Sequence, residues 1–226
     1  MMQKLQKFGA AMFVPVLLFS FAGIVVALTS LFNNPLIFGS LANTNTFWYG
    51  LWDTVQQGGW TVFNQVDMLF VVGLPIGLAK KAHGRAAMEA IVTYWTFNYF
   101  IAGFLTHWGA FFGLKDYVNT QIVANSANNG LTMIAGIKTL DTSIVGSLVI
   151  AGIVVWLHNR YFDKKLPDFL GTFQGSAFVV ILGFVAMFPV AFLTCLIWPR
   201  VQMGIIGLQE FMASSGLIGV WIFNFL

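Results

Sequence analysis

Long apolar runs, separated by short polar or charged segments, dominate the sequence. Apolar residues fill 8–32, and further runs cover 60–79, 86–106, 140–157 and 177–198. A helix needs about 20 apolar residues to cross the ~30 Å hydrocarbon core of a bilayer. The pattern therefore predicts an all-α, polytopic membrane protein with about five transmembrane helices.

Helix-stop signals and polar stretches mark the ends of these spans. Asn33-Asn34-Pro35 should end the first helix, because proline and asparagine favour turns. Residues 36–60 are rich in Asn, Thr and Trp, and predict an external loop with interfacial segments. A second long polar loop is expected over 107–138, and Pro199-Arg200 should close the fifth span.

The end of the sequence predicts two smaller segments. Over 201–215 one apolar stripe predicts an amphipathic connecting helix, with the spacing i, i+4, i+7, i+11 at Val201, Ile205, Leu208 and Met212. Residues 216–226 read as the truncated start of a sixth span, since the ten residues of the apolar run 217–226 reach only about 15 Å as a helix. We therefore expect a scaffold part over 1–200 and a chain that is the front of something longer.

The second span contains an irregular segment, Gly73 to Lys80. Pro75 has no N–H to donate to Val71 and should kink a helix there. Gly73 and Gly77 flank it at GxxxG spacing, which is typical of closely packed helices. The alternative is a helix break near a transport path, involving Gly73, Pro75, Gly77 and Lys80.

Composition and charge support a membrane location and argue against nucleic acid. The 226 residues are 58% hydrophobic and 8% charged, whereas soluble domains carry about 25% charge. The formal charge of +3 comes from basic residues at the ends of apolar runs, which is a poor nucleic-acid footprint. Lys4 and Lys7 also fit a signal peptide, but the run that follows is too long and more spans come after it.

The distribution of Lys and Arg predicts the orientation. If the N-terminus is cytoplasmic, eight basic residues lie inside and three outside, in agreement with the positive-inside rule. The inside group is Lys4, Lys7, Lys80, Lys81, Arg85, Arg160, Lys164 and Lys165, and the outside group is Lys115, Lys138 and Arg200.

Few residues suggest chemistry within the chain. The single cysteine, Cys195, lies in an apolar run, and neither a CxxC motif nor metal-ligand spacing occurs, so we expect no metal and no cofactor. Glu89, one turn into the third span, should sit at the interface beside Arg85. The polar aromatics within 93–99 are typical of helix packing, and alternatively of sugar binding.

Two polar features lie at the outer ends of spans. Lys138 and Asp141 are three residues apart, and we expect an ion pair at helical spacing rather than a sugar contact. His107 should be a solvated residue near a helix end. A Ser143–His107–Asp141 hydrolase site is disfavoured, because no nucleophile-elbow motif occurs.

Three long strings make the chain recognisable. They are GGWTVFNQVDMLFVVGLPIGLAKKAHGRAA, the segment from GLTMIAGIKTL through LHNRYFDKKLPDFLGTFQG, and WPRVQMGIIGLQEFMASSG. Together they resemble the membrane permease, enzyme IIC, of the bacterial sugar phosphotransferase system. The resemblance covers essentially the whole chain and is strongest to the α-glucoside branch of the glucose/maltose superfamily.

The resemblance implies a function and a limit to it. Family members are homodimers in the bacterial inner membrane that import and phosphorylate a sugar with phosphocarrier EIIA and EIIB proteins. The family's sugar-binding half carries an HH pair and a TEP string, and neither occurs here. We therefore expect a scaffold half that needs a missing half to act, with no catalytic residue of its own. The alternative is a truncated, non-transporting dimeric membrane protein.

The basic loop after the fourth span is the best candidate site. It can be a plain positive-inside anchor, or a cytoplasmic gate or docking site for an anionic phosphocarrier. Leu166-Pro167 and the glycines permit a loop that folds back toward the membrane. The candidate residues are His158, Asn159, Arg160, Lys164, Lys165, Pro167, Gly171, Gln174 and Gly175.

Overall fold

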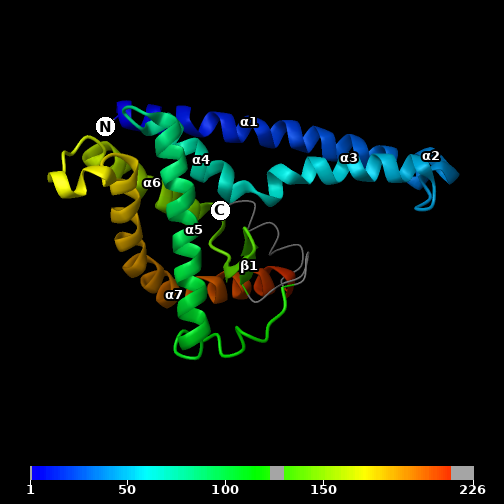
Figure 1. Cartoon of the computed structure of the whole chain (residues 1–226). Helices are drawn as coiled ribbons and strands as arrows, with labels where there is room; N and C mark the ends of the chain where they lie inside the picture. Colours follow the sequence, from blue (N-terminus) through cyan, green and yellow to red (C-terminus); the bar gives the residue numbers. More distant parts are fainter. Residues whose placement is uncertain (1, 123–129, 215–226) are drawn as a thin grey trace. The chain divides into compact units, whose positions relative to one another are not determined.

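The computed structural model describes residues 2–122 and 130–214 and is helical almost throughout (Figure 1). The α-helices are α1 (Met2–Phe32), α2 (Pro35–Phe38), α3 (Phe47–Asn64), α4 (Val66–Leu78), α5 (His83–Trp108), α6 (Ser143–Tyr161) and α7 (Ser176–Ser214). Two short 3₁₀ helices, η1 (Gly39–Ala42) and η2 (Asp168–Phe173), and a hairpin of β1 (Leu131–Ile134) and β2 (Ile137–Leu140) complete the described part. The all-α membrane class is confirmed.

The described residues form two compact units. The first lies within Met1–Tyr94 and Ser143–Ile181, and the second within Trp95–Thr142 and Leu182–Leu226. In the first unit α1 packs against α3 and α4, and α4 packs against α6. Figure 1 shows α1, in blue, running alongside α3, in cyan. The core of this unit is built around Phe70, Leu74 and Ala151.

The segment expected to be an external loop over 36–60 is mostly helix. Asn34 Oδ1 accepts from Leu36 N–H, and Pro35 begins α2 because its fixed φ suits the first helical position. Thr46 Oγ1 caps α3 by accepting from Tyr49 N–H at 3.1 Å. The loop prediction was therefore wrong for α3, in which Trp48 and Trp52 are half-buried and Trp60 is exposed.

Aromatic packing explains why this end of α3 is ordered against α1. Phe32 stacks on Trp52 with ring centroids 4.2 Å apart, and Trp48 Nε1 donates to the Phe32 carbonyl at 3.0 Å. Further along, an added Cβ on Gly59 would lie 3.0 Å from side-chain atoms of Val25 and Val26. The absence of a side chain at Gly59 thus permits the close approach of the two helices.

The helix break lies at Gln65, and α4 runs on through Pro75. α3 and α4 meet at Gln65 with a bend of 55°. α4 continues through Pro75 to Leu78, where the Ala79 N–H donates to the Pro75 carbonyl. α4 therefore ends only three residues after Pro75.

In the second unit a hairpin replaces part of the polar loop expected over 107–138. β1 and β2 pair antiparallel, with Leu131 opposite Leu140 and Ile134 opposite Ile137. Ala135 and Gly136 both have positive φ, as a tight two-residue turn requires. The hairpin takes Leu140 into a strand, so α6 begins at Ser143, three residues later than predicted.

α7 continues past the predicted stop at Pro199. It runs from Ser176 to Ser214 without interruption and contains Pro189 and Pro199. The expected boundary between a fifth span and a separate amphipathic helix over 201–215 was therefore wrong for the described residues. Part of that stretch, and the expected start of a sixth span over 216–226, lie outside the described residues.

Three described helical segments are long and apolar enough to cross a membrane. They are Gln6–Phe32 in α1, Ser143–Tyr161 in α6 and Ser176–Ile205 in α7, and the bent pair α3–α4 makes a fourth if it forms one span. α5 has 26 residues but is more polar. Its Glu89, Thr93 and Asn98 are buried within the protein. That α5 is a span stays a prediction.

Candidate functional site

The basic loop after α6 divides into a buried beginning and an exposed remainder. His158, in the last turn of α6, is buried, and Asn159 is half-buried. Arg160, Lys164 and Lys165 are exposed to solvent. His158 and Asn159 both make hydrogen bonds inside the protein, and their expected part in gating or docking stays a prediction.

The rest of the loop lies on the surface. Pro167 precedes the 3₁₀ helix η2, in which Gly171 is half-buried and Phe169 is 79% exposed. Gln174 Nε2 is 3.5 Å from the Leu166 carbonyl. Gly175 has a φ of 75°, a left-handed conformation that glycine adopts easily, and it leads into α7.

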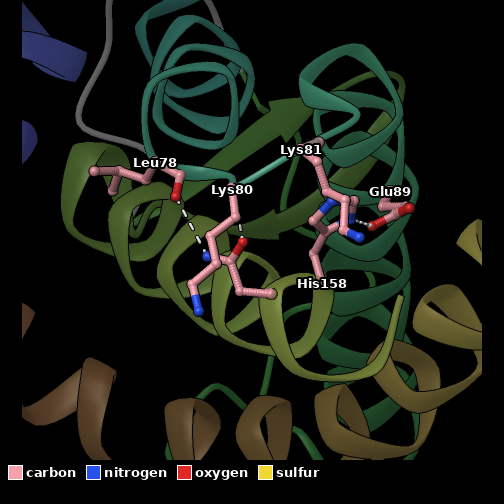
Figure 2. A network of polar contacts seen from close by, with 6 residues as sticks. Leu78, Lys80, Lys81, Glu89 and His158 are labelled. Carbon is pink, nitrogen blue, oxygen red and sulfur yellow. Dashed lines mark hydrogen bonds and ion pairs between the residues drawn. The ribbon is translucent and has the colours of Figure 1, made fainter. Parts of the chain in front are cut away.

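His158 bonds to a carboxylate and a carbonyl from two other segments. Its Nδ1 lies 2.7 Å from Glu89 Oε2 on α5, and its Nε2 lies 2.9 Å from the Lys81 carbonyl oxygen. Figure 2 shows His158 and Glu89 facing each other across the two helices. Glu89 was expected at the interface beside Arg85, and the structure shows its side chain, like that of His158, to be 0% exposed.

Asn159 ties the start of the basic loop to the end of α4. Its Oδ1 accepts from the Lys80 N–H at 2.7 Å, and its Nδ2 donates to the Leu78 carbonyl at 3.3 Å. A side-chain amide suits this position because it offers an acceptor and a donor together. Asn159 therefore satisfies two backbone groups where α4 ends and the turn over 79–82 begins.

The turn over 79–82 and the basic loop both carry exposed cations and contact each other. Lys81 Nζ forms an ion pair with Asp163. Arg160 and Lys164 both lie within cation–π distance of the Tyr161 ring, at 5.8 and 5.7 Å. We call the exposed Lys80, Lys81, Arg160, Lys164 and Lys165 the basic surface. Sequence reasoning placed Lys80 in a different candidate site and did not connect the two segments.

Gly73 and Gly77 serve close helix packing. A Cβ added at Gly73 would lie 2.8 Å from the Pro15 side chain, and one at Gly77 would lie 2.3 Å from Ala11 Cβ. The packing interpretation of the GxxxG spacing is confirmed, with α1 as the partner helix. A role for this segment beside a transport path stays a prediction.

A cavity of about 390 Å³ opens beside this contact between α1 and α4. Its walls are apolar apart from Gln65, which lies at the bend between α3 and α4. The lining residues include Ala11, Pro15, Gly73 and Gly77. No charged side chain lines it, so it offers no partner for a sugar phosphate.

A second cavity, of about 380 Å³, lies in the other unit and is more polar. Lys115, Asp116, Tyr117 and Gln202 are among its lining residues. The Tyr117 hydroxyl donates to the Lys138 carbonyl, and burial raises the pKa of this phenol above its ordinary value.

Lys138 and Asp141 were expected to form an ion pair at helical spacing, but Lys138 does not lie in a helix. It lies in β2, and its Nζ donates to the carbonyls of Tyr117, Val118 and Thr120. The Asp141 carbonyl accepts from Trp198 Nε1 at 2.6 Å. That expectation was wrong in its geometry, because residues 137–140 form a strand.

His107 is exposed in the last turn of α5, as expected.

The polar aromatic stretch of α5 is mainly internal. Tyr94, Phe97 and Asn98 are buried, and Tyr94 Oη donates to Asp67 Oδ2 at 3.3 Å. The packing interpretation therefore holds for these three residues. Tyr99, at 65% exposure, faces outward.

Comparison with known proteins assigns the family. A family model described as phosphotransferase system, EIIC, matches residues 9–226. The chain belongs to this family. This EIIC chain is 57% identical over 226 residues to the maltose-specific EIICB component of Bacillus subtilis, covering 100% of the chain and 42% of that relative. The resemblance found in the sequence is confirmed.

Two further relatives agree. The α-glucoside-specific EIICB component of Fusobacterium mortiferum is 55% identical over 226 residues, covering 100% of the chain and 42% of the relative. The phosphotransferase IIC component GlvC of Escherichia coli is 53% identical over 227 residues, covering 100% of the chain and 60% of the relative. The EIIC chain thus spans about two fifths to three fifths of the curated relatives it matches.

Proposed function

We propose that this EIIC chain is the membrane-spanning scaffold of a permease that imports and phosphorylates maltose or a related α-glucoside. The observation that carries the proposal is the similarity along the whole chain to relatives named for these sugars, at 57% and 55% identity. The packed arrangement of α1, α3, α4 and α6 around an apolar core supports a scaffold role.

The proposed location is the bacterial inner membrane, with the N-terminus in the cytoplasm. The excess of Lys and Arg on one set of loops supports this orientation. The hydrogen bond between Asn159 and Lys80 adds further support, because it requires the turn over 79–82 and the loop after α6 to lie on the same side of the membrane.

The basic surface is the proposed docking or gating site for the phosphocarrier EIIA and EIIB proteins. A phosphorylated carrier is anionic, and a group of like-signed charges attracts it over about 10 Å at moderate salt. Lys80, Arg160, Lys164 and Lys165 are exposed, whereas Lys81 is partly compensated by Asp163. Two loops that are distant in sequence contribute to one face, which favours recognition over simple anchoring.

Residues 1–226 by themselves are proposed to hold no complete sugar site and no phosphoryl-transfer residue. The family's HH pair and TEP string do not occur in this sequence. A homodimer is the proposed assembly. The alternative, a dimeric membrane protein without transport activity, is favoured by the same missing motifs.

Transplanting the chain into a relative tests the function directly. In the Bacillus subtilis maltose-specific EIICB component, the aligned segment is replaced by this chain, and phosphoenolpyruvate-dependent maltose phosphorylation is measured in membrane vesicles. We expect activity within about tenfold of the relative. A chimera that is inserted and folded but inactive on both maltose and other α-glucosides would overturn the proposal.

Matched charge reversals in the chimera test the basic surface. Arg160→Glu with Lys164→Glu should lower the phosphorylation rate, and the loss should grow as salt is reduced, since screening weakens surface electrostatics. Lys115→Glu, an exposed lysine outside the basic surface, is the control and should leave the rate unchanged.

Calorimetry on residues 1–226 alone should show no saturable maltose binding, and such binding would contradict the proposal that these residues hold no complete sugar site.

A further inference from the structure

The buried pair Glu89 and His158 joins a helix residue that no motif singled out to the first residue of the candidate loop. The two side chains come from α5 and α6, and both are 0% exposed. A buried ionisable pair in a membrane protein is expensive unless its charges and hydrogen bonds are satisfied.

Hydrogen-bond chemistry sets the number of protons in this pair. The Lys81 carbonyl oxygen can only accept, so His158 Nε2, 2.9 Å away, must carry a hydrogen. A bare Nδ1 lone pair and a carboxylate oxygen would repel each other at 2.7 Å, so one further proton must lie between His158 Nδ1 and Glu89 Oε2. The pair is then either imidazolium with carboxylate or imidazole with carboxylic acid. Both forms are neutral overall, which limits the cost of burial.

We infer that Glu89 and His158 form a proton-binding site whose shared proton locks α6 to the turn over 79–82. The proton joins α5 to the imidazole, and the imidazole holds the turn through the Lys81 carbonyl. Glu89 and His158 are thus positioning residues for the basic surface. That consequence for docking rests on the proposed function, whereas the proton site does not.

The turn that is held in this way is strained. Ala82 has a φ of 48°, a left-handed conformation that is unfavourable for a non-glycine residue. Such conformations persist where the surrounding structure over-determines them. The His158 bond to Lys81 and the two Asn159 bonds supply that constraint immediately before Ala82.

Three neighbouring segments contribute charged groups near the buried pair, and these groups are exposed. The turn contributes the exposed Lys80 and Lys81, and the first turn of α5 contributes the exposed His83 and Arg85. The loop after α6 contributes Asp163, paired with Lys81, and Phe162 covers the imidazole with ring centroids 4.5 Å apart. Glu89 is therefore the carboxylate in direct contact with His158.

Spectroscopy on the EIIC chain in detergent tests the proton directly at neutral pH. Nitrogen NMR of His158, assigned with His158→Gln, reports whether each ring nitrogen carries a hydrogen. The infrared difference between wild type and Glu89→Gln reports a carboxylic acid. An imidazolium signal or a carboxylic-acid band supports the site. A neutral imidazole together with an ionised Glu89 would overturn it.

Hydrogen exchange tests the lock. The Lys80 amide, bonded to Asn159, should exchange at close to the wild-type rate in Glu89→Gln, because the glutamine amide can donate to Nδ1 without an extra proton. In Glu89→Leu, which leaves His158 Nδ1 unpaired, exchange should be faster by roughly 5- to 150-fold. Asp163→Asn, which breaks only the exposed ion pair, is the control and should change little.

Two outcomes would refute the lock. One is Glu89→Leu exchanging like wild type, and the other is Glu89→Gln exchanging as fast as Glu89→Leu. If Glu89→Leu fails to fold, the exchange rate of the Lys80 amide in Glu89→Gln, compared with wild type, and the two spectra still test the proposal. None of these measurements needs transport, so an inactive chimera would count against the proposed function alone.

Discussion

Replacing Gly77 by alanine should loosen the contact between α1 and α4. The added Cβ would lie 2.3 Å from Ala11 Cβ and 2.7 Å from Ala11 Cα. Real Cβ atoms are essentially never closer than 3.0 Å to such neighbours. Because Ala11 Cα belongs to the backbone, α1 itself must move, and a rotamer change cannot relieve the clash.

The size of the effect follows from two opposing terms. Alanine is favoured over glycine in a helix interior by about 1 kcal/mol, and overpacking a close contact costs about 1–3 kcal/mol. Gly152 in α6 has nothing within 4 Å of the added Cβ, so Gly152→Ala shows the first term alone. The unfolding free energies of the two variants should therefore differ by about 1–3 kcal/mol.

Thermal unfolding in one detergent, followed by tryptophan fluorescence, measures this difference. At about 2–4 °C per kcal/mol for a chain of this size, Gly77→Ala should melt roughly 2–12 °C below Gly152→Ala. Ala11→Gly should rescue Gly77→Ala only in part, since the Ala11 Cα remains close. Equal melting temperatures of the two single variants would refute the packing argument.

Three further changes test other contacts by the same unfolding assay. Thr46→Ala removes the cap of α3 and should cost about 0.5–2 kcal/mol, whereas Thr46→Ser should cost much less. Asn159→Leu should cost about 1–3 kcal/mol by leaving the Lys80 N–H unpaired. Burial raises the pKa of Tyr117 above 10.0, so its stabilisation is complete below that pH and is lost as the pH rises further. Tyr117→Phe should remove that alkaline loss, and an unchanged alkaline slope would contradict the assignment.

The long apolar runs correctly predicted the most apolar helices, because hydropathy measures how strongly a segment favours lipid over water. α1, α6 and the first part of α7 lie where these runs lie. α3 was missed because its surface is half polar: Gln56 bonds to Ser30 while Trp48 and Trp52 pack on Phe32. Composition averaged over 36–60 cannot separate such a helix from a polar loop.

The hairpin and the bend were missed for local reasons. The turn residues are Ala135-Gly136, and alanine at positive φ gives no signal of the kind that Asn-Gly gives. Pro75 is a strong helix-breaking residue, yet it lies so near the end of α4 that the helix simply stops. The bend at Gln65 has no Pro or Gly at the break, so the sequence gives no local signal for it.

The candidate site was found in part. The cations after α6 were visible as a charged run, but the burial of His158 was not, because its partner lies 69 residues away. The available signal was that Glu89 is the single acid in the sequence of α5. A buried acid in a helix that runs through a membrane protein needs a partner, and the His158 imidazole is that partner.

An anchor and a docking surface make different demands on the same charges. An anchor needs only that Lys and Arg remain on one side of the membrane, and it tolerates a loose turn. A docking surface needs Lys80 held at a fixed place relative to Arg160, and loosening the turn spreads the charges without removing any. The two Asn159 bonds, the His158 bond and the strained Ala82 fix that geometry at a cost in free energy that an anchor would not require. These contacts therefore support the proposed recognition of an anionic partner, and the charge reversals at Arg160 and Lys164 test it against anchoring.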